Sequence, residues 1–436
     1  MTGPALGARP AIHYNRKVSS RRISHVRWWT LCLLFFATTI NYLDRIVLSF
    51  LAPVIRRDIY LPEEVYGYVT GAFSFAYMIG FLLVGKFIDH YGTRIGYAVA
   101  ITWWSVAAAC HALARSALAL GIWRGLLGLG ESGNFPAAIK AVAEWFPKKD
   151  RAFATGIFNA GSNVAAMAGP PLLVWMNAHF GWRGCFFITS SLGLIWLSLW
   201  LATYRPPDKH PRVSPAELAY IRSDPEEARE PDIGWTAALK YRQTWAFTIA
   251  KFLTDPVWWF YLWWLPLYLA DIRKLTLAQA GWAVPVVYLM ADFGSVAGGW
   301  LSGFFLRRGW SVSRARKTAM SICACAMPIS AMAVFMPNIV VAIALVSMAT
   351  AGHQGWSANL YTTVSDVFPK RAVASVVGIG GCAGALGGVL FSSVIPGHVI
   401  AHFGYKPVFL TMGCFHLTAL LVFHRLMGRI ARLPAQ

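Results

Sequence analysis

Charged residues are scarce in this sequence of 436 residues. Only 13% of its residues are Asp, Glu, Lys or Arg, whereas soluble domains carry about 25%. Hydrophobic residues make up 57%, and apolar runs of about 20 residues, the length that crosses roughly 30 Å of hydrocarbon, recur between short charged breaks. The composition excludes an ordinary soluble domain and predicts an all-α membrane protein that crosses the bilayer many times.

Cysteines and catalytic motifs are also few. The seven cysteines lie within or beside apolar runs, so neither a disulfide framework nor a zinc site is indicated. Cys323 and Cys325 form a lone CxC pair, which we interpret as packing. The sequence contains no HExxH, serine–lysine or paired-aspartate pattern. We therefore expect no metal, no cofactor and no enzymatic activity.

Acidic residues are the rarer charged class, with 19 Asp and Glu against 39 Lys and Arg, a formal net charge of +20. In a soluble protein this excess would suggest a nucleic-acid partner. Here the basic residues gather in alternate segments between apolar runs, the distribution that holds such segments on the cytoplasmic side. We predict a multi-pass membrane protein with both termini cytoplasmic and no nucleic-acid partner.

Apolar runs and charged breaks together predict twelve transmembrane helices. They start near residues 27, 66, 95, 117, 151, 184, 243, 279, 315, 339, 372 and 406. The longest polar stretch is rich in proline and charge, which is typical of a linker. The predicted organisation is a cytoplasmic tail (1–26), a six-helix bundle (27–204), a cytoplasmic linker (205–242), a second six-helix bundle (243–428) and a short tail (429–436).

The two predicted bundles share sequence. WFPKKDRAFATG at 145–156 aligns without a gap with VFPKRAVASVVG at 367–378, an offset of 222 residues, and AHFGWR at 178–183 recurs as AHFGYK at 401–406. Parallel repeats of this kind are related by a pseudo-two-fold axis along the membrane normal, with the substrate site near the midplane between them.

Four ionisable residues interrupt the apolar runs of the first half. Asp44 and Arg45 lie in the first predicted span, within the stretch NYLDR, and Arg124 and Glu131 lie seven residues apart in the fourth. A charge inside the bilayer costs at least about 2.5 to 3.5 kcal/mol on insertion scales, so these side chains are expected to line a polar cavity. The pattern leaves open which acid pairs with which arginine. A static buried salt-bridge cluster is the competing interpretation.

The chain resembles the major facilitator superfamily over essentially its whole length. The segment GKFIDHYGTR is similar to the superfamily's G-x-x-x-D-[RK]-x-G-[RK]-[RK] loop, and RGLLGLG to its R-x-x-x-G-x-G helix motif. His90 and Thr93 depart from the loop pattern. The resemblance implies a gating role for the residues that match: Gly85, Asp89, Gly92 and Arg94.

A narrower resemblance, to the anion:cation symporter family, rests on NxxDR, RGLLGLGESGNFPAA and AEWFPKKDRA. The resemblance implies that Asp44 and Glu131 couple transport to protons. It also implies that Arg45, Arg124 and Tyr77 bind a sugar acid. KFLTDPVWWFYLWWLP and HQGWSANLYTTVSDVFPK are similar to hexuronate transporters within that family.

The second half supplies other candidates. The 222-residue offset carries Glu131 onto His353, in GHQGWSANLY of the tenth span. A polyol acid needs hydrogen-bond partners and an aromatic face to lie against, and interhelical packing is the alternative. The expected substrate-binding residues here are His353, Gln354, Trp356 and Asn359, with Asn163 from the fifth span. Asp255-Pro256 in the seventh span predicts a broken helix.

Together with these resemblances, the features predict a proton-coupled symporter of the bacterial inner membrane that works by alternating access. The resemblance to hexuronate transporters implies that its substrate is a hexuronate, glucuronate or galacturonate. Its expected partners are a small carboxylate substrate, protons and membrane lipid, and it is expected to be monomeric. The alternatives are a transporter of another carboxylate, such as an aldonate or aldarate, and an anion exchanger. The acids Asp44 and Glu131 argue against the exchanger, because paired arginines alone would serve it.

Overall fold

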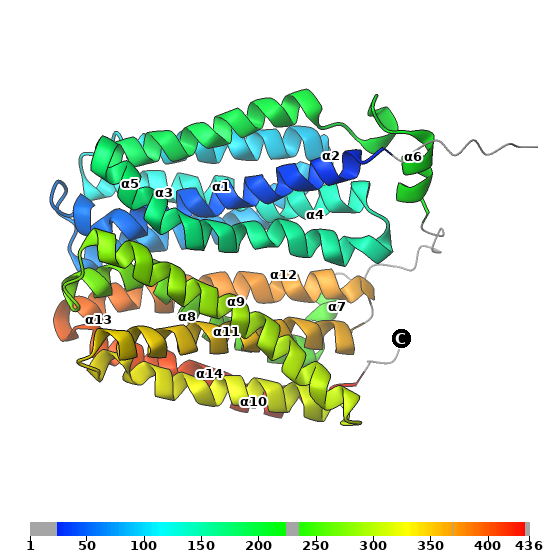
Figure 1. Cartoon of the computed structure of the whole chain (residues 1–436). Coiled ribbons are helices and arrows are strands. Elements are labelled where there is room, and N and C mark those ends of the chain that lie inside the picture. Colours follow the sequence, from blue (N-terminus) through cyan, green and yellow to red (C-terminus); the bar gives the residue numbers. More distant parts are fainter. Residues whose placement is uncertain (1–23, 224–234, 369, 432–436) are drawn as a thin grey trace, which may run out of the picture.

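The computed structural model describes residues 24–223, 235–368 and 370–431, and the described chain is mainly helical. Its helices are α1 (Val26–Ile55), α2 (Glu63–His111), α3 (Ala117–Glu131), α4 (Asn134–Trp145), α5 (Lys148–Thr203), η1 (Pro207–Lys209), α6 (Pro215–Ile221), α7 (Trp235–Ala238), α8 (Arg242–Asp271), α9 (Leu277–Arg307), α10 (Val312–Ala331), η2 (Met332–Phe335), α11 (Ile339–Val367), α12 (Lys370–Gly387), η3 (Gly388–Val394), α13 (Ile395–Phe403) and α14 (Tyr405–Met427). In Figure 1 the helices before the linker form one half of the molecule and those after it form the other.

Two of these helices are too long for one crossing. α2 has 49 residues, about 74 Å at 1.5 Å per residue, and α5 has 56. Each is interrupted by a glycine in the left-handed region, Gly92 (φ 80°, ψ 161°) in α2 and Gly181 (φ 67°, ψ 173°) in α5. We count α2 and α5 as two crossings each, and α3–α4 and α12–α13 as one crossing each. The described residues then form the twelve predicted membrane crossings. Every predicted start lies within about three residues of an observed helix start or glycine turn.

The sequence repeat is also a structural repeat. The AHFG copy at 178–181 ends in Gly181 and the copy at 401–404 ends in Gly404, whose backbone is nearly the same (φ 73°, ψ −170°). Both copies join the last two crossings of their half. Only glycine adopts this conformation readily, which is why the motif keeps it in both places. The repeat predicted from the sequence is confirmed at these turns.

The seventh predicted span differs from expectation. α8 runs without a break from Arg242 to Asp271, with Pro256 inside it, so the predicted broken helix is wrong. Proline removes one backbone hydrogen bond, and the helix continues through it with α12 packed directly against the same turn. A Cβ on Gly387 would lie only 2.1 Å from the Phe252 carbonyl oxygen, the acceptor that Pro256 leaves without its helical donor. Two other spans are divided instead: the fourth into α3 and α4, and the eleventh by the π-helix η3 between α12 and α13.

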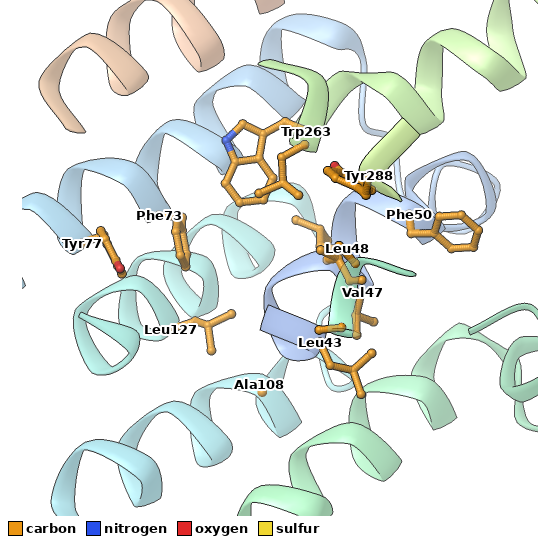
Figure 2. Close-up of a cluster of buried hydrophobic side chains, with 14 of the residues drawn as sticks. Leu43, Val47, Leu48, Phe50, Phe73, Tyr77, Ala108, Leu127, Trp263 and Tyr288 are labelled. Atoms are coloured by element: carbon orange, nitrogen blue, oxygen red, sulfur yellow. The ribbon is translucent and has the colours of Figure 1, made fainter. Parts of the chain in front are cut away.

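Seven helices in the described ranges are long and apolar enough to cross a membrane by length and composition alone. The two halves meet in a continuous buried cluster. Figure 2 shows Phe73 of α2 and Leu48 of α1 in one cluster with Trp263 of α8 and Tyr288 of α9. This interface positions the polar residues described next.

Candidate functional site

The four ionisable residues of the first half come together where α1 faces α3. Asp44, Arg45, Arg124 and Glu131 are each at most 1% exposed. Arg45 donates from Nε to Glu131 Oε2 over 2.8 Å, and Arg124 donates from Nη2 to the carbonyl oxygen of Arg45 over 2.7 Å. The pairing that the sequence left open is therefore Arg45 with Glu131.

Several polar atoms in this cluster have no hydrogen-bond partner among the described residues. They are both carboxylate oxygens of Asp44, Oε1 of Glu131, and Nε and Nη1 of Arg124. The hydroxyl of Thr189 lies beside Asp44, yet its hydrogen bond goes to the Phe186 carbonyl oxygen. Buried polar groups are normally satisfied, and exceptions mark strained or functional sites. The cluster thus holds spare donors and acceptors in one place.

Aromatic rings surround both arginines. The guanidinium carbon of Arg45 lies 4.5 Å from the ring centroid of Tyr42, 4.9 Å from that of Tyr77 and 5.3 Å from that of Trp259. Arg124 lies 4.8 Å from the ring of Phe73; Figure 2 shows Tyr77 and Phe73 side by side on α2. Such contacts favour a desolvated cation. They also form a layer between the charge cluster and two cavities that lie between the halves.

Two adjoining cavities of about 270 and 300 Å³ lie between the halves, near the middle of α1, α8 and α11. The residues that line both are Tyr42, Trp258, Gln354, Ser357 and Tyr361. Tyr77 and Trp259 line the first cavity, whereas neither cavity is lined by Arg45 or Arg124. In this conformation the rings separate the arginines from the cavities.

Among the described residues, the cation that lines the first cavity is Lys251 of the second half. Lys251 Nζ lies 2.6 Å from Asp255 Oδ2 and donates to the Tyr361 hydroxyl over 2.8 Å, and all three residues line the cavity. Gly384 of α12 leaves room for this pair, because a Cβ there would lie 2.2 Å from Asp255 Oδ2. The sequence contains a signal for this pair, a lysine and an aspartate four residues apart in an apolar run, which the prediction of a helix break at Asp255-Pro256 does not use.

His353 lines the same cavity and has a partner that the sequence did not reveal. Its Nδ1 lies 3.3 Å from Nε2 of His416 on α14, and its ring stacks on Trp258 with centroids 5.9 Å apart. Gln354 lines both cavities, and Asn163 of α5 lines the second. These three predicted residues are therefore gathered at one site.

Trp356 and Asn359 lie elsewhere. Trp356 is fully buried in a separate apolar cluster. Asn359 donates from Nδ2 to the carbonyl oxygens of Gly298 and Gly355, each over 2.9 Å, which ties α11 to α9. Neither residue lines the two cavities, and the contacts of Asn359 match the interhelical alternative.

The predicted gating residues surround the turn in α2. Gly92 makes the turn, and Arg94 donates to the carbonyl oxygen of Leu201 over 2.6 Å. Gly85 lies in the helix before it. The side chain of Asp89 is outside the described part of the structure.

A model of the Major Facilitator Superfamily matches residues 34–392. The chain belongs to this superfamily. It is therefore a multi-pass membrane transporter and not an enzyme. A solved structure of a bacterial homologue of the human lysosomal transporter Spinster shares the fold, with a TM-score of 0.78 at 19% identity, over 94% of this chain and 100% of the solved one.

Curated relatives within the superfamily cover nearly the whole transporter. It is 32% identical to the hexuronate transporter of Escherichia coli K12 over 92% of its own length and 94% of the relative's. It is 29% identical to a D-galactonate transporter of E. coli O6:H1, over 95% and 99%. It is 30% identical to the probable galactarate/D-glucarate transporter GudP of Bacillus subtilis, over 93% of each chain.

Proposed function

We propose that this transporter imports a sugar-acid anion, a hexuronate above all, together with at least one proton. The observation that carries the proposal is the buried Arg45–Glu131 pair, with the unpaired Asp44 beside it, next to cavities at mid-depth between the two halves. The names of the relatives support a sugar acid, and the hexuronate transporter is among those with the highest identity.

The cavities suit a small polyhydroxy acid. At about 270 and 300 Å³ they lie at the small end of the usual range for ligand sites. Lys251 supplies a cation for a carboxylate, while Asn163 and Gln354 supply amide groups for hydroxyls. The ring of Trp258 gives the sugar a flat apolar face.

Proton coupling would use the two acids of the first half. A buried carboxylate is far costlier as an anion than as an acid unless a cation pairs with it, so Asp44 would be the acid that takes up the proton. Glu131 would instead form the ion pair with Arg45. Protonation of Glu131 would release Arg45, which would then turn between Tyr42 and Tyr77 towards the substrate carboxylate. Arg124, with two spare N–H groups, would strengthen the same site.

Alternating access would follow from rocking of the two halves. At the end of the molecule where α1 stops, Arg56 joins the first half to Asp271 of α8 over 2.8 Å, and Tyr66 donates to the carbonyl oxygen of Trp263 over 2.7 Å. With both termini cytoplasmic in the inner membrane, this closed end would be the outer one. Gly85, Asp89, Gly92 and Arg94 would control the opposite end.

The proposal is tested by uptake into proteoliposomes of four labelled acids: glucuronate, galacturonate, galactonate and galactarate. Each is measured with and without an inward proton gradient. We expect gradient-driven accumulation of a hexuronate above the other two. Preferential uptake of galactonate or galactarate would refute the hexuronate assignment and retain the sugar-acid class. Exchange without any response to the gradient would refute symport.

A further inference from the structure

A cluster of metal-binding side chains joins the two halves at the Arg56 end. Glu64 lies in the first turn of α2, and His398 and His402 lie one turn apart on α13. Nδ1 of His398 is 3.1 Å and Nδ1 of His402 is 3.3 Å from Oε1 of Glu64. One potential ligand atom from each of the three residues lies within 4.8 Å of the other two.

These distances suit a transition-metal ion. Zinc takes imidazole nitrogens at about 2.0 to 2.1 Å and carboxylate oxygens at about 2.0 to 2.2 Å in tetrahedral sites, which places neighbouring ligand atoms about 3.3 Å apart. Two imidazoles with one carboxylate favour zinc-like ions over magnesium or calcium, which prefer oxygen. Nδ1 of His402 also lies 3.0 Å from the carbonyl oxygen of His398, so an ion would replace that hydrogen bond or use Nε2 after rotation of the ring.

The backbones of the two helices that carry the ligands pack closely together. Between them, α2 and α13 touch at two glycines: a Cβ on Gly67 would lie 3.0 Å from the Cα of Gly397 and 2.6 Å from the carbonyl oxygen of Ser393. The ligand side chains are partly exposed, with 35% exposure for Glu64 and 63% for His398. An ion can therefore reach them from solvent without the helices moving apart.

We infer that Glu64, His398 and His402 form a binding site for a zinc-like divalent ion, and that the bound ion clamps the two halves together at this end. No sequence motif indicates a metal site here, because the glutamate and the histidines are more than 330 residues apart. The clamp acts on the transport cycle and is independent of which anion is carried.

Binding is tested by calorimetric titration of Zn²⁺ into the purified full-length protein, with any affinity tag removed. We expect one site per chain in the native protein. The variants His398→Gln and His402→Gln should each bind at least about tenfold more weakly, the scale of loss seen when metal sites are perturbed. His179→Gln, which removes an exposed histidine outside the cluster, should bind as the native protein does. Equal Zn²⁺ affinity in all four proteins, or binding of Mg²⁺ by the native protein as tight as that of Zn²⁺, would overturn the site.

The clamp is tested in proteoliposomes with Zn²⁺ on both sides of the membrane. The quantity measured is uptake of whichever labelled sugar acid the native protein transports. Uptake by the native protein should slow severalfold and recover on addition of EDTA, whereas uptake by Glu64→Gln and His398→Gln should respond little. Equal inhibition of native and variant proteins, or unchanged uptake by a native protein that binds zinc, would overturn the clamp. Because titration needs no substrate, failure of the sugar-acid proposal would leave the binding result intact.

Discussion

Removal of the Glu131 charge should destabilise the transporter strongly, and simultaneous removal of the Arg45 charge should reverse much of that loss. Arg45 is 1% and Glu131 0% exposed, and the paired atoms are 2.8 Å apart. At an effective dielectric constant of about 20, two unit charges at that distance attract by about 6 kcal/mol. Desolvation offsets part of this, so Glu131→Gln, which leaves the arginine buried and unpaired, should cost about 3 to 5 kcal/mol.

The double variant Arg45→Met with Glu131→Gln removes both buried charges. Replacing both members of a buried pair is often nearly neutral, so this variant should be more stable than Glu131→Gln by about 2 to 4 kcal/mol. SDS-induced unfolding in mixed micelles, followed by tryptophan fluorescence, measures the difference. The exposed pair Arg183–Asp58 gives the control, because Arg183→Gln should cost at most about 1 kcal/mol. A double variant that is no more stable than Glu131→Gln would refute the buried pairing.

Three further predictions concern packing, the closed end and pH. Gly128→Ala should cost about 1 to 3 kcal/mol, because its Cβ would lie 2.4 Å from a carbonyl oxygen of α2, while Gly125→Ala, with 3.7 Å to the nearest atom, should be tolerated; thermal unfolding compares the two, and equal losses would contradict the packing. Arg56→Gln breaks the partly exposed pair with Asp271, so spin-label distances across that end should show an open population raised up to about fivefold, and an unchanged distribution would exclude a role in closure. A hydrogen bond from Trp182 and the neighbouring Arg183 lower the pKa of Asp58 below its ordinary value near 3.8; its stabilisation is complete above that value and is lost as the pH falls through the lowered pKa. Asp58→Asn should therefore leave the pH profile of transport between pH 5 and 8 unchanged, and a shifted profile would refute this assignment.

The fold could be predicted because each membrane-spanning helix is recognisable in the sequence as an apolar run of the length that crosses the bilayer. Apolar runs of about 20 residues and short charged breaks placed each crossing within a few residues. The AHFG repeat located the same turn twice, at Gly181 and Gly404. The division of the fourth crossing into α3 and α4 was missed, because SGN in an apolar run does not by itself indicate a helix end.

The membership of the charge cluster could also be predicted, but its pairing could not. The free-energy cost of a charge in hydrocarbon is enough to require Asp44, Arg45, Arg124 and Glu131 to avoid lipid. The choice of Arg45 as the partner of Glu131 depends instead on how α1 and α3 are rotated about their axes. Spacing along one helix does not fix that rotation.

The second half shows the same limit more clearly. His353 and Trp356 lie three residues apart in the tenth span and are both expected to bind substrate, yet His353 lines a cavity and Trp356 is buried in packing. The contacts of Lys251 with Tyr361 and of His353 with His416 join different helices. Such contacts depend on tertiary packing, which the spacing of residues along one sequence does not reveal.

The proposed coupling of sugar-acid import to protons through the acids of the first half is decided by the variant Asp44→Asn. Labelled glucuronate and galacturonate uptake is measured in proteoliposomes with and without an inward proton gradient, alongside exchange at equal pH, for the native protein and the variant. We expect the native protein to accumulate a hexuronate and the variant to lose accumulation while it retains exchange. Accumulation by Asp44→Asn equal to that of the native protein would show that Asp44 does not couple import to protons.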